Sequence, residues 1–177
     1  YKLSKRSGKA ITLSTLNDEI PIDAARFFFN LREPNSHFDF DLDLAVSQTS
    51  QNPVYYVQYA HARICSVLKM MNEEGIEVKS LQKAALRVFT APEEQEMIKH
   101  LATLPNVINE AAKAYDPAKV TKYVIDLATM YHKFYNNCRI MGENESVMQA
   151  RLSLSLAVKQ VIKNILDMLK ITCPESM

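Results

Sequence analysis

The first nine residues carry the residue types that stabilise a phosphate. The stretch "YKLSKRSGK" holds Lys2, Lys5, Arg6 and Lys9, and no acidic residue follows until Asp18. Closely spaced cationic groups, a small hydroxyl and a glycine that permits close backbone approach suit a polyphosphate. Basic loops are also common on ordinary solvated surfaces, so this segment alone leaves both interpretations open.

A second group of residues suits contact with nucleic acid. In the segment 53–74, Tyr56, Tyr59 and Arg63 recur at helical spacing, about 100° round the helix from the apolar seam that contains Val57. Aromatic faces and a guanidinium on such a surface would stack on unpaired bases. Alternatively, the tyrosines widen the core face and keep only their hydroxyls at its rim.

The sequence predicts no metal site and no nucleophile motif. The histidines lie on separate predicted elements without an i, i+4 partner, so we expect each to be exposed or hydrogen-bonded inside the fold. The three cysteines are far apart and form no CxxC pair, which favours reduced thiols in a cytoplasmic protein. The residues concerned are His37, His61, His100 and His132, and Cys65, Cys138 and Cys173.

Composition indicates a packed globular fold with no strong overall field. Of 177 residues, 47% are hydrophobic and 23% are charged. Lys and Arg number 21 against 20 Asp and Glu, so any contact with nucleic acid must come from local patches. No apolar run is long enough to span a membrane and no signal peptide is visible, so no membrane partner is predicted. A first residue other than Met suggests a piece of a longer chain.

Glycine content and hydrophobic periodicity predict an all-α protein. Only 3 glycines occur, which is hard to reconcile with a turn-rich β fold. We expect a short strand at 11–13, brief helices at about 15–19 and 22–31, and a loop entering a helix near 39–46. Four long helices follow: 53–74, one that opens with a capping box at Thr90 and Glu93, 117–141, and one that ends before Pro174.

These elements predict a helical bundle at 51–177, preceded by a smaller helical region at 1–50. Each long helix has one apolar stripe that should face the core. The predicted core residues are Val57, Ala60, Ile64, Val67, Met71, Met97, Leu101, Val120, Val124, Leu127, Tyr131, Phe134, Cys138, Leu154, Val158, Val161, Ile165 and Leu169.

Several stretches resemble one family in that family's order. "KLSKR" at 2–6 is similar to the KMSKS signature loop of class I aminoacyl-tRNA synthetases, and "NPVYYVQYAHARI" at 52–64 resembles a segment of arginyl-tRNA synthetases. Four further stretches resemble the C-terminal part of that family: "DFDLDLAV" at 39–46, "KFYNNCRI" at 133–140, "ARLSLSLAVKQVIKNILDML" at 150–169 and the closing "PESM".

The resemblance implies an ATP-dependent, AMP-forming arginine-tRNA ligase as the full-length parent. In that family the KMSKS-type loop steadies the phosphates of Mg-bound ATP while arginine is activated. Lys2, Ser4 and Lys5 match the loop's ATP-binding residues; Lys2 and Lys5 would be catalytic, with Lys5 nearest the leaving pyrophosphate. The nucleotide-binding domain with the HIGH signature is missing, so we expect this fragment alone to hold no cofactor and to be inactive.

The resemblance also implies that the helical bundle binds the anticodon arm of tRNA-Arg. Tyr56, Tyr59, Tyr135 and Met177 fall at positions that resemble the family's anticodon contacts, and Arg63 shares a helix face with the first two. We expect these residues to share one surface of a cytoplasmic monomer. The alternative is a non-catalytic helical protein–protein interaction module derived from a synthetase.

Overall fold

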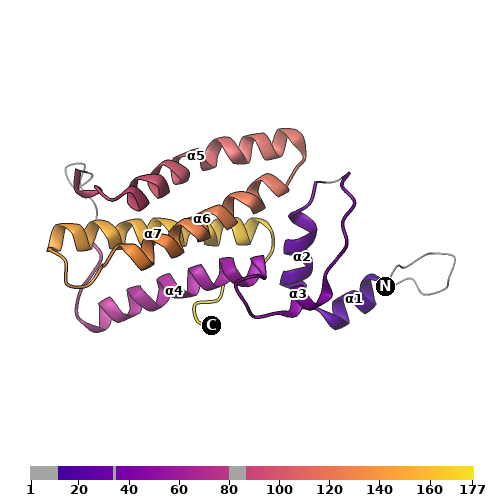
Figure 1. Cartoon of the computed structure of the whole chain (residues 1–177), viewed down its shortest axis with the longest axis horizontal. Coiled ribbons are helices and arrows are strands. Elements are labelled where there is room, and N and C mark those ends of the chain that lie inside the picture. The colour runs from indigo at the N-terminus through magenta and orange to yellow at the C-terminus, as the bar shows by residue number, and fades with distance from the viewer. Residues whose placement is uncertain (1–11, 34, 80–86) are drawn as a thin grey trace.

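Four long helices run along the molecule and three short helices lie at one end in the computed structural model (Figure 1). The structure describes residues 12–33, 35–79 and 87–177. Within these ranges all regular structure is helical, which confirms the all-α class. Lys2, Ser4 and Lys5 lie outside the described residues.

The short helices are α1 (Leu13–Glu19), α2 (Ile22–Asn30) and α3 (Leu42–Val46). Leu13 begins α1, so the strand predicted at 11–13 is wrong in its described part; the residues that the structure describes include no second strand with which it could pair. The loop predicted before residue 46 is present, and the Asp41 carboxylate accepts a 2.9 Å bond from the Leu44 N–H to start α3.

The long helices are α4 (Pro53–Glu73), α5 (Pro92–Ala114), α6 (Ala118–Asn137) and α7 (Glu145–Met168). Helices α4, α6 and α7 contact one another, and α5 packs chiefly on α6. The predicted bounds of α4 hold within one residue. Helix α6 ends at Asn137, earlier than predicted, because Cys138 has left helical geometry (φ −112°, ψ 98°).

The apolar stripes of these helices meet in one core, as the periodicity predicts. Most of the predicted core residues are buried, and Leu101, Val161 and Leu169 are half-buried at its edge. Tyr131 is fully buried and its hydroxyl donates to Ser155 Oγ at 3.4 Å. Burial raises the pKa of Tyr131 to about 12, so its hydroxyl keeps its proton.

The capping box of α5 lies one residue later in the chain than the predicted box at Thr90 and Glu93. The cap position is Ala91, and Glu94 rather than Glu93 accepts a 2.9 Å bond from the Ala91 backbone N–H. Thr90 is exposed and precedes the cap. The Glu94 carboxylate also meets a cation inside the fold, which sequence spacing could not show.

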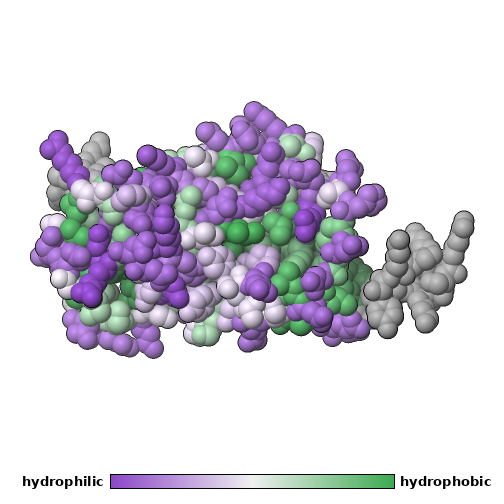
Figure 2. Space-filling view, viewed as in Figure 1, coloured by the Kyte–Doolittle hydropathy of each residue, from purple (hydrophilic) through white to green (hydrophobic). Residues whose placement is uncertain are grey.

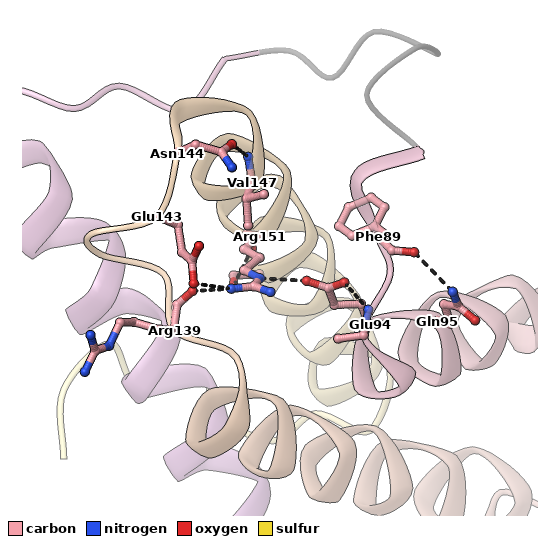
Figure 3. Close-up of polar contacts among 10 residues, drawn as sticks. Phe89, Glu94, Gln95, Arg139, Glu143, Asn144, Val147 and Arg151 are labelled. Carbon is pink, nitrogen blue, oxygen red and sulfur yellow. Dashed lines mark hydrogen bonds and ion pairs between the residues drawn. The ribbon is translucent and has the colours of Figure 1, made fainter.

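That cation is Arg151 of α7 (Figure 3). Arg151 Nε lies 2.6 Å from Glu94 Oε1, and the two side chains are only 13% and 1% exposed. The same guanidinium donates to the Arg139 carbonyl and lies 3.4 Å from Glu143. One buried ion pair therefore joins the start of α5 to α7 and to the loop that follows α6.

Replacing Arg151 by Met should lower the free energy of unfolding by about 3–5 kcal/mol, because the Glu94 carboxylate would stay buried without its cation. Urea unfolding followed by circular dichroism measures this change. The control is Lys163→Met, which breaks the exposed Lys163–Asp167 pair at 3.4 Å and should cost about 1 kcal/mol or less. Equal losses in the two variants would contradict a special role for the buried pair.

The N-terminal helices expose more apolar surface than the long helices do in this view. Figure 2 shows hydrophobic residues gathered over α2 and α3, whereas hydrophilic residues cover much of the bundle. Leu13, Ile22 and Phe29 are 67%, 48% and 47% exposed. None of the helices in the described ranges has the length and low charge that crossing a bilayer requires.

Candidate nucleic-acid interface

The start of α4 is fixed by a buried asparagine. Asn52 is 3% exposed, and its side-chain oxygen accepts a 3.2 Å bond from the Val54 N–H. Its amide nitrogen donates to the carbonyls of Ala45 and Ser47 at 3.2 and 2.8 Å. These bonds anchor the first turn of α4 to the end of α3, and so set the direction in which the first tyrosines of α4 point.

A surface hollow of roughly 360 Å³ lies where α4, the end of α6 and the C-terminal tail meet. Four of the residues predicted from the sequence line it together: Tyr59, Arg63, Tyr135 and Met177. The remaining lining residues are Ala62, Ser66, Val67, Met70 and Ser176. We call this site the α4–α6 hollow; its size is near the lower end of the ~300–1,000 Å³ range of small-molecule sites.

Arg63 lies between two tyrosine rings in this hollow. Its guanidinium carbon is 4.7 Å from the centroid of the Tyr59 ring and 4.6 Å from that of Tyr135. Arg63 Nη2 also donates to the Tyr59 hydroxyl at 3.1 Å. The two cation–π contacts hold the guanidinium in place. Among the described residues no carboxylate forms an ion pair with it, so its positive charge is available to an anion.

His132 of α6 supports this arrangement from the core side. Arg63 Nη1 lies 3.1 Å from His132 Nδ1, and because arginine can only donate, Nδ1 must be the unprotonated nitrogen. The ring proton is then on Nε2, which faces the Tyr56 carbonyl at 3.4 Å. The imidazole stacks on the Tyr59 ring, with 5.7 Å between the two ring centroids. Burial lowers the pKa of His132, which favours this neutral form.

Tyr56 differs from the other predicted residues. It is half-buried and does not line the hollow. Its ring packs on that of His132, with 4.6 Å between the ring centroids. The interpretation that the tyrosines widen the core face therefore fits Tyr56, whereas Tyr59 and Tyr135 are 37% and 41% exposed.

The sequence predicted only that His132 is exposed or hydrogen-bonded, and did not indicate that it connects α6 to Arg63 and Tyr56 of α4. The available signal was its spacing, since His132 precedes Tyr135 by three residues and shares its helix face. Two other histidines donate to backbone carbonyls: His61 Nδ1 to Pro174 at 2.8 Å and His100 Nε2 to Tyr123 at 3.1 Å. No group of three metal-ligating side chains occurs within the ranges described.

Comparison with known proteins assigns the fold to a family. The model of the DALR anticodon binding domain matches residues 57–177, which include every residue lining the hollow. The chain belongs to this family. Its resemblance to the C-terminal part of arginyl-tRNA synthetases is confirmed as well, because 99% of the chain matches arginine-tRNA ligases.

The similarity to individual relatives extends over nearly the whole chain. It is 51% identical to the arginine-tRNA ligase of Caldanaerobacter subterraneus subsp. tengcongensis and 49% identical to that of Acetivibrio thermocellus. In both cases 99% of the chain is matched, and it spans 31% of the relative's length.

Solved structures share the fold. A Campylobacter jejuni protein assigned as an arginyl-tRNA synthetase superposes with a TM-score of 0.81 at 28% identity, over 100% of this chain and 37% of its own. The Thermus thermophilus arginyl-tRNA synthetase superposes with a TM-score of 0.75 at 25% identity, over 98% of this chain and 29% of its own length.

Acidification should destabilise the protein through His132 and His61. Burial lowers the pKa of both below the ordinary 6.5. The unfolded chain then binds protons more strongly than the folded one, so stability is lost as the pH falls through 6.5 toward the folded-state pKa values. The urea midpoint should therefore be lower at pH 5.5 than at pH 7.5.

His132→Gln should flatten this pH dependence, because it removes one of the two histidines whose pKa burial lowers, while His61 keeps part of it. His37→Gln, which removes an imidazole at an exposed position, is the control. An unaltered slope in His132→Gln would show that His132 does not titrate in this range.

Proposed function

We propose that this chain binds the anticodon arm of tRNA-Arg as part of an arginine-tRNA ligase. The observation that carries this proposal is the convergence of Tyr59, Arg63, Tyr135 and Met177 on one hollow of an anticodon-binding domain. These residues come from two helices and the tail, and core packing alone does not require them to be exposed together.

The chemistry of the hollow suits an unpaired base and its phosphate. Tyr59 and Tyr135 are 37% and 41% exposed, so part of each aromatic ring is accessible, and stacking on aromatic rings tolerates any base. Arg63 offers an unpaired charge, while Val67, Met70 and Met177 form an apolar wall. The hydroxyls of Ser66 and Ser176 can contact base edges, which would add selectivity.

The remaining parts of the ligase would act through the N-terminal region. We propose that residues 1–50 end the catalytic domain and that 51–177 form the anticodon-binding bundle. Lys2, Ser4 and Lys5 would contact Mg-bound ATP in the full enzyme, where arginine is activated. The exposed apolar side chains Leu13, Ile22 and Phe29 support contact between this region and further protein. We further propose a cytoplasmic monomer.

Direct binding tests the proposal. The 177-residue chain should bind tRNA-Arg more tightly than a tRNA-Arg whose anticodon bases are substituted, as measured by filter binding at fixed salt. Equal affinity for the two RNAs would show that the chain does not recognise the anticodon. No binding to either would favour the alternative, a helical protein–protein interaction module. The same chain should neither activate arginine nor charge tRNA.

Tyr59→Ala should weaken tRNA-Arg binding roughly ten- to a hundredfold, because stacking contributes about 1–3 kcal/mol per base. Binding titrations measure the loss, and circular dichroism melting checks the fold. The matched control is Tyr115→Ala, which removes an 87% exposed ring at the C-terminal end of α5. Equal affinity of Tyr59→Ala and the parent, both folded, would exclude a stacking role for Tyr59.

Arg63→Ala should reduce the slope of log affinity against log salt by about one, because one phosphate contact would be lost. Arg63→Lys keeps the charge but loses the planar stack between the tyrosines. It should therefore keep the salt slope and still bind more weakly. If both variants retain the parent's slope, Arg63 does not meet a phosphate.

In the full enzyme, Lys5→Ala should lower kcat for arginine activation far more than it raises KM for arginine. A positive charge near the leaving pyrophosphate acts mainly as charge develops in the transition state. Pyrophosphate exchange measures both constants, and Lys9→Ala is the neighbouring control. A change confined to KM would refute the role assigned to Lys5.

A further inference from the structure

The C-terminal tail leaves α7 in a defined direction. Helix α7 ends at Met168, and Lys170 adopts the left-handed conformation with φ 57°. The Ile171 N–H then donates to the Leu166 carbonyl at 2.9 Å, and the Ile171 side chain is buried. The chain is therefore turned back toward α4 and α2 before it reaches the hollow.

Asp23 of α2 holds the next tail residue. Its Oδ1 accepts a 3.1 Å bond from the Thr172 N–H, and its Oδ2 accepts bonds from the Thr172 hydroxyl and, at 3.1 Å, from Gln58 Nε2. Gln58 Nε2 also donates to the Thr172 carbonyl at 2.9 Å. The backbone and side chain of Thr172 are thus fixed together. We call Asp23, Gln58 and Thr172 the tail latch.

Further contacts lie on both sides of the tail latch. Before it, Arg26 of α2 donates to the Lys170 carbonyl. After it, His61 Nδ1 donates to the Pro174 carbonyl at 2.8 Å, since a carbonyl can only accept. Two residues later, Ser176 and Met177 line the α4–α6 hollow. Little chain is left free between the latch and the hollow.

We infer that Asp23 is a positioning residue of the proposed RNA site: it holds the tail so that Met177 forms one wall of the hollow. This inference rests on the proposed function. Asp23 lies outside residues 57–177, which match the anticodon-binding domain. Helix α2 would thus contribute to RNA recognition without touching the RNA, because three donors converge on its one carboxylate, that of Asp23.

Asp23→Asn tests the first step without RNA. The substitution keeps the shape of the side chain but presents an amide to donors that need an acceptor. With ¹³C-labelled methionine methyl groups, the Met177 signal, assigned by deleting that residue, should move toward its random-coil position and sharpen. Asp18→Asn removes the same charge at an exposed position of α1 and should leave the signal unchanged.

Binding of tRNA-Arg tests the second step. Removal of Met177 and Asp23→Asn should each weaken binding by about tenfold, equivalent to about 1.4 kcal/mol. Their combination should weaken it no further, because both remove the same wall. A merely structural role for Asp23 predicts additive losses instead. Losses that multiply in the double variant would overturn the inference.

A second pair of variants covers the case in which Asp23→Asn does not fold. Thr172→Val removes the hydroxyl at nearly constant shape and should reproduce the Met177 shift, whereas Thr172→Ser keeps the hydroxyl and should restore the parent's signal. An unchanged Met177 signal in folded Asp23→Asn or Thr172→Val would refute the latch. Failure of the parent to bind tRNA-Arg would refute the proposed function alone, since the methyl spectrum still reports on the latch.

Discussion

The hydrogen bond between Arg63 and His132 is the interaction on which the hollow depends. It joins α4 to α6 across 3.1 Å and leaves the other edge of the guanidinium at the surface. A neutral imidazole is required, because a second cation at this distance would repel the first. Two tyrosine rings complete the cage around Arg63, so a single unpaired charge is held rigidly where solvent can reach it.

The sequence predicted the bundle because each long helix has one continuous apolar stripe. The stripe through Val57, Ile64 and Met71 is buried as its spacing requires. The same spacing placed Tyr59 and Arg63 beside that stripe, and only proximity in space could add Tyr135 and Met177 from distant segments. The resemblance to a known family supplied those two residues, and the geometry of the hollow brings them together with the others.

What could not be predicted are the contacts between polar groups on different elements. The bond from Arg151 to Glu94 spans α5 and α7, and no local pattern distinguishes Glu94 from Glu93 beside it. His132 was likewise indistinguishable from an ordinary hydrogen-bonded histidine, because its partners Arg63 and Tyr56 lie on another helix. The helical periodicity of apolar residues predicts which face of a helix is buried, but it does not predict the hydrogen-bond partner of a buried polar atom on that face.

The physical unit of the site is larger than the segment that matches the family. Asp23 precedes that segment, yet it binds Thr172, four residues before Ser176 of the hollow. The coupling is reciprocal: a ligand that binds more tightly when the tail latch is formed stabilises the latch by that same coupling free energy. Helix α2 belongs to the region proposed to end the catalytic domain. An RNA held in the hollow as proposed would therefore favour the contacts that Asp23 and Arg26 of α2 make with the tail.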